Sequence, residues 1–228
     1  MIILKEVSKH HKNGFVAIDE LTLTIDQGDF VFLVGPSGAG KSTLLNLLTG
    51  EKKPTSGQIN VLNYPVNRLT DDQIPELRRQ IGVIFQDYKL LPKRTVYENI
   101  AFALRVLNYS RSACHQMVPQ VLELVGLTSK AHHYPTELSG GEQQRICIAR
   151  AIVHNPPILL ADEPTGNLDP DTAWDIMHLL SKINQRKTTL IIATHDKEIV
   201  NKMRKRVIKI EHGRITKDLA MGAYHDTV

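Results

Sequence analysis

One glycine-rich stretch constrains this chain more than any other feature of its sequence. Residues Gly35–Ser42 read G-P-S-G-A-G-K-S, with an apolar run, Phe30–Val34, before them and apolar residues at helical spacing after them. A G-x-x-x-x-G-K-S pattern between a strand and a helix is typical of a phosphate-binding loop, because glycines let backbone N–H groups turn toward phosphate oxygens and the helix N-terminus adds positive potential. We expect Lys41 to reach the β- and γ-phosphates and the Ser42 hydroxyl to bind Mg²⁺. The nucleotide-binding residues predicted from this loop are Gly35, Pro36, Ser37, Gly38, Ala39, Gly40, Lys41, Ser42 and Thr43.

A second apolar run ends in two carboxylates. Ile158–Ala161 reads I-L-L-A and is followed by Asp162 and Glu163. Beside a phosphate-binding loop, Asp162 can hold Mg²⁺ and Glu163 can polarise the water that attacks the γ-phosphate. Because neighbouring side chains at a strand end point to opposite sides, we expect the two carboxylates to have different roles.

Gln86 also follows an apolar run, Ile81–Phe85. Ligands of open α/β sheets gather at the carboxyl ends of the strands, which favours a role for a polar side chain at this point. A glutamine after a strand is more often an ordinary loop residue. Its position alone therefore leaves both interpretations open.

The order of the patterns predicts an α/β fold. Strand patterns at residues 2–7, 22–25 and 58–62 surround the loop unit and are typical of an antiparallel β subdomain. From residue 87 the strand patterns disappear, and helical periodicity begins with a capping box in which Thr95 precedes Glu98. We predict a single domain, residues 2–228, with a P-loop NTPase (RecA-like) core. The core and its β subdomain take up residues 1–86 and 157–228, and an all-helical insertion takes up residues 87–156. The last dozen residues lack a packing pattern, so we expect them to form a tail.

The composition of the chain indicates where the protein is located and which kinds of partner it binds. Lys and Arg number 28 against 24 Asp and Glu, a small and dispersed surplus, so we predict no nucleic-acid partner. The N-terminus lacks a signal-peptide pattern, and no apolar run approaches the roughly 18–20 residues that span a bilayer. Cys114 and Cys147 are far apart and lack metal-ligand spacing, as expected in a reducing compartment. We expect a cytoplasmic protein that reaches a membrane only through a partner.

The motifs taken together resemble those of ABC-type ATPases over about residues 2–216. They stand in that family's order of Walker A, Q-loop, signature, Walker B, D-loop and H-switch: Gly35–Ser42, Gln86, Leu138–Gln143, Ile158–Glu163, Gly166–Asp169 and His195. The L-S-G-G-E-Q stretch is the most specific of them. The resemblance implies an ABC nucleotide-binding domain that hydrolyses ATP with Mg²⁺ to ADP and phosphate.

The resemblance also implies a site shared between two chains. In this family the P-loop of one subunit faces the signature of the other, so we expect a homodimer. Ser139, Gly140, Gly141 and Glu142 begin a predicted helix whose N-terminus suits the γ-phosphate. The resemblance assigns catalysis to Glu163, His195 and Gln86, Mg²⁺ binding to Ser42, Gln86 and Asp162, and a dimer contact to Asp169.

One position departs from the family pattern. Many relatives have an aromatic residue that stacks on adenine within V-S-K-x-Y, and here the sequence Val7–His11 places His11 at the tyrosine position. An imidazole ring stacks on adenine more weakly than a phenol ring does. We assign His11 to adenine, with Phe15 or Val16 as alternative packing surfaces.

The stretch Phe85–Pro92, F-Q-D-Y-K-L-L-P, and the T-V-Y-E-N of residues 95–99 resemble the FtsE family of cell-division ATPases. That family pairs with the integral membrane protein FtsX, so the resemblance implies contact with an FtsX-like protein near Gln86–Ile100. It further implies a peripheral location on the inner face of the cell membrane and an output that activates cell-wall hydrolases. Two alternatives stay open: the motor of a lipoprotein or peptide exporter, and a soluble ATP-gated clamp without a membrane partner.

Overall fold

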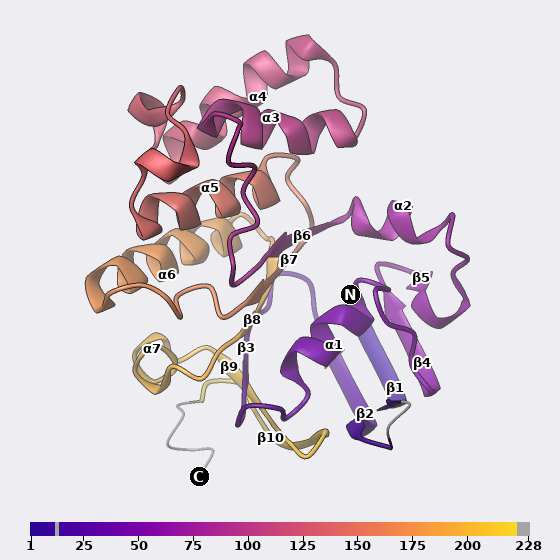
Figure 1. Ribbon diagram of the computed structural model, residues 1–228. Coiled ribbons are helices and arrows are strands. Elements are labelled where there is room, and N and C mark those ends of the chain that lie inside the picture. The colour runs from indigo at the N-terminus through magenta and orange to yellow at the C-terminus, as the bar shows by residue number, and fades with distance from the viewer. Residues whose placement is uncertain (12–13, 223–228) are drawn as a thin grey trace.

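The computed structural model describes residues 1–11 and 14–222, and within them the chain forms two β-sheets. The larger sheet has the strand order β10-β9-β3-β8-β7-β6, and the smaller one has the order β2-β1-β4-β5 (Figure 1). The larger sheet is parallel except for its last strand, which pairs antiparallel with β9. Its strands are β3 (Phe30–Val34), β6 (Ile81–Ile84), β7 (Ile158–Asp162), β8 (Thr189–Ala193), β9 (Arg206–Glu211) and β10 (Arg214–Leu219).

The smaller sheet is antiparallel and comes almost entirely from the N-terminal quarter of the chain. Its strands are β1 (Ile2–His10), β2 (Val16–Ile25), β4 (Ser56–Val61) and β5 (Tyr64–Pro65). β1 and β2 extend well beyond the strand patterns that the sequence shows at residues 2–7 and 22–25. The register of β1 against β2 shifts at bulges, where Glu6 and Glu20 adopt positive φ angles of 50° and 49°. Each bulge interrupts the alternation that marks a strand in sequence.

The helices lie on both sides of the larger sheet. They are α1 (Lys41–Leu48), α2 (Ile74–Arg78), α3 (Val96–Val106), α4 (Arg111–Val125), α5 (Gly140–Ile152), α6 (Pro170–Gln185) and α7 (Lys197–Met203), with short 3₁₀ turns at Val66–Arg68, Thr128–Lys130 and Pro135–Glu137. The predicted capping box of α3 is confirmed, since Thr95 Oγ1 accepts from Glu98 N at 3.2 Å and Glu98 Oε2 accepts from Thr95 N at 2.9 Å. Pro119 lies inside α4 without ending it.

Two cores lie on opposite faces of the larger sheet. Phe32 and Val34 pack toward α3, α4, α5 and α6, whereas Val31 and Leu33 pack toward α1 and the smaller sheet. The alternation follows from the strand period of two, and because both faces are covered, β3 is apolar at every position. The sheet is therefore fixed from both sides, and its carboxyl ends form a rigid base for the loops that follow the strands.

The α/β architecture with an antiparallel β subdomain agrees with the sequence prediction. Helices α3, α4 and α5 gather at one end of the molecule, at the top of Figure 1. The division into 1–86, 87–156 and 157–228 stays a prediction. The tail prediction is wrong for its first residues, because β10 extends to Leu219, and residues 223–228 lie outside the described part of the chain. Among the residues described, no helix has the length and apolar character needed to cross a bilayer.

Candidate active site

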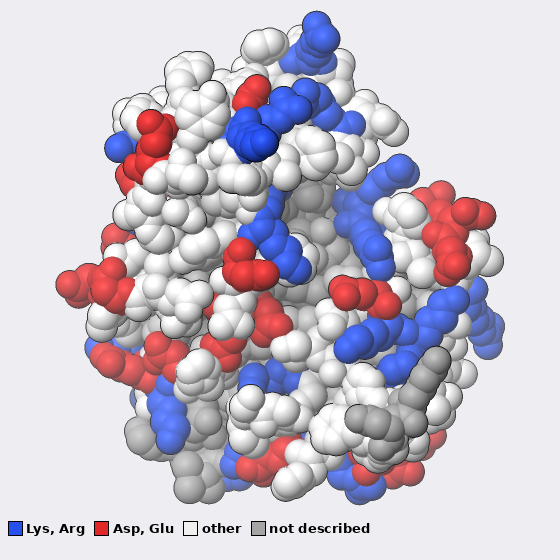
Figure 2. Space-filling model, in the orientation of Figure 1, with Lys and Arg blue, Asp and Glu red and all other residues white. Residues whose placement is uncertain are grey.

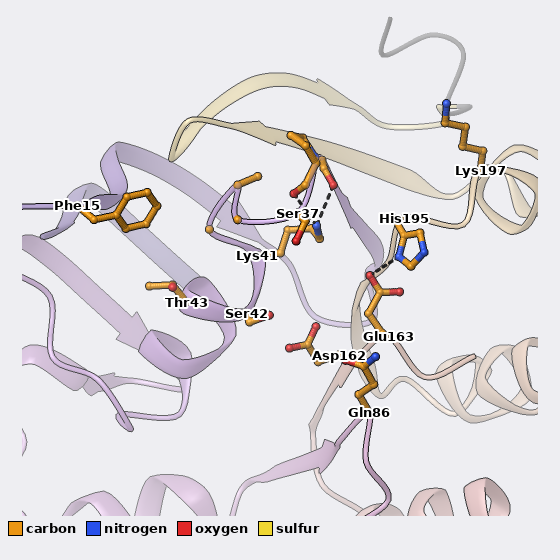
Figure 3. A pocket seen from close by; sticks show the side chains of 15 residues that line it. Phe15, Ser37, Lys41, Ser42, Thr43, Gln86, Asp162, Glu163, His195 and Lys197 are labelled. Atoms are coloured by element: carbon orange, nitrogen blue, oxygen red, sulfur yellow. Dashed lines mark hydrogen bonds and ion pairs between the residues drawn. The ribbon is translucent and has the colours of Figure 1, made fainter. Parts of the chain in front are cut away.

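A cavity of about 640 Å³ lies over the carboxyl ends of the central parallel strands. The loop between β3 and α1 forms one wall, and the residues that follow β6, β7 and β8 form the other (Figure 3). Its lining consists of Phe15, Gly35–Thr43, Gln86, Asp162, Glu163, His195 and Lys197. All nine residues predicted from the glycine-rich loop are therefore in the lining, together with four of the predicted residues from three other loops.

The start of α1 is built to receive an anion. Its N-cap is Gly40, which provides no side-chain cap, and its first turn contains no acidic residue. The first backbone N–H groups therefore keep their capacity to donate to a bound oxygen. A side chain at Gly40 would clash with the backbone, because an added Cβ would lie 2.4 Å from the carbonyl oxygen of Ala17. The loop can take this path only with glycine there.

Lys41 is the first residue of α1, and its ammonium reaches back across the loop. Nζ donates to the carbonyl oxygens of Gly35 at 2.8 Å and Pro36 at 3.1 Å, and only 9% of the residue is exposed. A nearly buried cation is thus held at the cavity wall by neutral carbonyl groups. It can transfer its hydrogen bonds to a phosphate with little movement, since an anionic acceptor binds an ammonium more strongly than a carbonyl does.

Asp162 and Glu163 follow β7 in different directions. Asp162 is the last residue of the strand and turns toward Ser42, whereas Glu163 turns toward His195 (Figure 3). The separation arises from the backbone, because Glu163 has a left-handed φ of 48° and its N–H donates to the carbonyl oxygen of Ala193 at 2.9 Å. Left-handed non-glycine residues cluster at functional sites, where the surrounding structure maintains them.

His195 is joined to Glu163 by a short hydrogen bond. Nδ1–H donates to Glu163 Oε1 at 2.7 Å, while 14% of the glutamate side chain and 73% of the histidine side chain are exposed. Because an ionised carboxylate only accepts, the second oxygen of Glu163 stays available for another donor. The loop behind the histidine is fixed by Asp196, which caps α7 by accepting from Ile199 N at 3.0 Å. The pair thus presents an oriented carboxylate to the cavity.

The signature residues are not part of this cavity. Ser139 caps α5 with a reciprocal capping box, in which Ser139 N donates to Glu142 Oε2 at 2.9 Å and Glu142 N donates to Ser139 Oγ at 3.3 Å. The hydrogen bond from Ser139 N lowers the pKa of Glu142, so this carboxylate is held in its charged form. The first turn of α5 packs tightly on α6, since a Cβ at Gly141 would lie 2.4 Å from Thr172 Cγ2. Within one chain, the signature is separate from the glycine-rich loop.

Asp169 has a local structural role. It is the N-cap of α6, and its Oδ1 accepts from Thr172 N at 3.0 Å. Hydrogen bonds from Thr172 lower the pKa of this carboxyl. The dimer contact assigned to Asp169 stays a prediction.

His11 does not line the cavity, and Phe15 does. The two rings stack with centroids 6.0 Å apart and planes inclined by 24°. Phe15 is 52% exposed, so part of its ring is accessible from the cavity. Lys197 is the lining residue that sequence reasoning missed, because a single lysine after His195–Asp196 carries no distinguishing pattern.

The chain is similar to known ATP-binding proteins in both sequence and structure. The family described as ABC transporter matches residues 18–166. The Cell division ATP-binding protein FtsE of Bacillus subtilis is 54% identical over 224 residues, which is 98% of each chain, and that of Mycobacterium tuberculosis is 52% identical over 225 residues, also 98% of each. The solved post-hydrolysis dimer of the ATP-binding cassette MJ0796, bound to ADP and Pi, is similar with a TM-score of 0.86 and 36% identity, over 98% of this chain and 100% of that one.

Proposed function

The chain belongs to the ABC transporter family, and we propose that it hydrolyses ATP as a dimer on a membrane partner resembling FtsX. It is an ABC ATPase subunit of the cell-division type, similar to FtsE proteins over nearly its whole length. The observation that carries the proposal is the cavity in which the glycine-rich loop, Asp162 and the Glu163–His195 pair converge. Its output is movement of the partner that activates cell-wall hydrolases. The chain acts on the cytoplasmic side of the cell membrane, as a peripheral subunit.

The residues at the floor of the cavity fit Mg²⁺. Ser42, Asp162 and Gln86 line the same cavity with a hydroxyl, a carboxylate and an amide, all of them hard oxygen donors. Mg²⁺ usually keeps several waters and takes further ligands from substrate phosphates, so a small number of side chains is sufficient to hold it. When bound, Mg²⁺ would neutralise charge on the phosphates.

Glu163 acts as the general base in this proposal. Its carboxylate accepts a proton from the attacking water as the water oxygen bonds to the γ-phosphorus and the bond from that phosphorus to the ADP oxygen breaks. The hydrogen bond from His195 Nδ1 holds one carboxylate oxygen at 2.7 Å and leaves the other to face the water. Gln86 lines the cavity on the side of Asp162 and orients the same water.

A second copy of the chain would complete the site. Ser139–Glu142 lies outside the cavity of its own chain, at a helix N-terminus suited to a phosphate. Two chains can therefore form two sites if each signature faces the cavity of the other. Hydrolysis by the purified chain with ATP and Mg²⁺ tests this arrangement, because the specific rate should rise with chain concentration. A specific rate that is independent of concentration over the range in which monomers associate would contradict it.

We assign the adenine contact to Phe15, with His11 packed behind it. Replacing Phe15 with alanine should raise the KM for ATP about two- to tenfold and leave kcat within about twofold, since one aromatic stacking pair is worth about 0.5–1.5 kcal/mol. His11→Ala is the matched comparison and should raise KM less, because it removes only the ring behind the platform. Steady-state kinetics measures both. A larger KM effect for His11→Ala would return the adenine contact to His11.

A hollow whose lining reaches Phe85 adjoins the segment Gln86–Ile100 and offers a surface for the partner. This cavity of about 200 Å³ has an apolar floor that includes Val83, Phe85 and Leu160, and Arg78 stands at its edge. Figure 2 shows the hollow on this face, with basic side chains on both sides of it. Glu51 and Asp162 also line the hollow, so an amphipathic segment of the membrane partner would bury apolar side chains there and place an acidic one against Arg78.

Reversing one rim charge should weaken membrane association. Arg78→Glu is expected to lower recovery of the chain on membranes that contain the partner by at least about threefold, because a rim charge steers association. The ATPase rate of the purified chain should not change. Arg68→Glu is the matched control, an exposed arginine on the β subdomain that does not line the hollow. Equal recovery of the two variants would remove the hollow as the partner site.

A further inference from the structure

The backbone directly after Gln86 is unusually constrained. Tyr88 and Lys89 are consecutive non-glycine residues with left-handed φ angles of 54° and 48°. Single residues of this kind are uncommon and two in succession more so, because each side chain crowds its own backbone. Such a turn persists only where its surroundings hold it. The side chains that contact this turn therefore stabilise an unfavourable backbone conformation.

The holding groups come from α5, the helix that begins with the signature. The guanidinium of Arg150 donates from Nη2 to the carbonyl oxygen of Tyr88 at 2.8 Å and from Nη1 to that of Lys89 at 2.6 Å. Cys147 Sγ–H also donates to the Tyr88 carbonyl, at 3.0 Å. Burial raises the pKa of Cys147 to about 12, so the thiol keeps the proton that it donates. The planar guanidinium can donate to two successive carbonyl oxygens at once from two fixed nitrogens, and a lysine ammonium does not have this geometry.

The side chains of the turn fix it at two further points. The Tyr88 hydroxyl lies against the start of α5, only 3.3 Å from the position that a Cβ on Gly140 would occupy. The Lys89 ammonium lies 4.2 Å from the centroid of the Phe85 ring, on the strand side of Gln86. Figure 1 shows the chain crossing α5 on its way from β6 to α3. The turn therefore joins Gln86, which follows β6, to both the first and the last turns of α5.

We propose that Arg150 is a positioning residue that clamps the Tyr88–Lys89 turn onto α5 and so couples Gln86 to the signature of the same chain. Gln86 serves the ATP site of its own chain, and Ser139 serves that of the second copy. A clamp between them makes α5 and the Q-loop move together, so that closure of one site positions the water-orienting glutamine of the other. The inference rests on the proposed function, because it assumes that Gln86 acts on bound ATP.

The first test compares arginines on one helix. Arg150→Ala should lower kcat at least about tenfold while the dissociation constant for ATP, measured by fluorescence with a labelled nucleotide, stays within about twofold, since no part of the glycine-rich loop is altered. Arg145→Ala is the matched control: Arg145 lies on α5 and donates to the Val125 carbonyl at 3.2 Å, but it does not contact the turn. It should leave kcat within about twofold. Equal losses in both variants would overturn the inference.

The second test separates clamping of the turn from support of the fold. Glycine adopts left-handed φ angles without crowding, so Lys89→Gly lowers the need for a clamp by more than it loses in the exposed Lys89 contact with the Phe85 ring. Adding Lys89→Gly to Arg150→Ala should restore kcat at least about threefold, and adding it to Arg145→Ala should restore nothing. If Arg150→Ala does not fold, Arg150→Lys takes its place with the same expected direction. Absence of rescue in the Arg150 background contradicts the clamp, whereas absence of hydrolysis by the unaltered chain contradicts the proposed function.

Discussion

Replacing Glu163 with glutamine should lower kcat by about 10³-fold, within the range of about 10²–10⁴ that a general base contributes. The amide has the shape of the carboxylate and can still accept from His195 Nδ1 through its oxygen, so the local geometry should persist. It cannot accept the proton of the attacking water. ATP should bind as before, because Lys41 and the N-terminus of α1 are unchanged.

Because turnover becomes very slow while ATP binding continues, the Glu163→Gln variant should accumulate as an ATP-bound dimer. Size-exclusion chromatography with ATP and Mg²⁺ should show a dimer that the unaltered chain forms only transiently. Glu198→Gln is the matched control, since Glu198 is an exposed acid on α7 that pairs with Lys202 rather than with the cavity. Undiminished hydrolysis by Glu163→Gln protein would falsify the assignment of the general base to this residue.

The sequence predicted the parts of the site that follow from local rules. The glycine-rich loop between an apolar strand and a helix, and the carboxylates after Ile158–Ala161, each have a spacing that the chemistry requires within one segment of chain. The parallel sheet then brings the segments together, because the carboxyl ends of β3, β7 and β8 lie at one edge. The motifs and their order were sufficient for this part of the prediction, whereas the strand order comes from the structure.

The side of the cavity that we propose for adenine is formed by contacts that sequence order does not specify. His11 stands at the family's aromatic position, but the structure places its ring behind Phe15, which lines the cavity. The sequence does not show which of the two rings faces the cavity, because that depends on backbone contacts such as the hydrogen bond from His11 N to the Phe15 carbonyl oxygen at 2.8 Å. The bulges in β1 and β2 also interrupt the strand pattern, so the sequence did not predict the full length of either strand.

Tyr88 shows the same limit. The family resemblance placed Tyr88 in a segment predicted to contact a partner, and nothing in the sequence indicated that its half-buried ring lies against the start of α5. The left-handed turn at Tyr88 and Lys89 directs the ring inward, and residues some sixty positions later, Cys147 and Arg150, hold that turn. Non-local hydrogen bonds that stabilise an unfavourable backbone leave no periodic pattern in a sequence.

Replacing Lys41 with alanine should weaken ATP binding about 100-fold. An ammonium that donates to phosphate contributes about 1.5–3 kcal/mol as a hydrogen bond to a charged group, and the nearly complete burial of Lys41 places it at the upper end. Each 1.4 kcal/mol is a tenfold change in the dissociation constant. Equilibrium binding of a fluorescent ATP analogue measures the effect directly, without dependence on turnover or on dimer formation.

The same substitution should also lower the stability of the protein without nucleotide. Nζ satisfies the carbonyl oxygens of Gly35 and Pro36, so alanine removes two hydrogen bonds and about 1–3 kcal/mol of the free energy of unfolding. Lys197→Ala is the matched control, because Lys197 lines the same cavity but its side chain points away from the glycine-rich loop (Figure 3). It should change the dissociation constant less than about threefold. The loop carbonyls and the phosphate compete for one ammonium, so Lys41→Ala should reduce both the free energy of unfolding and the affinity for ATP. If the variant lost only stability, Lys41 would support the loop without binding phosphate.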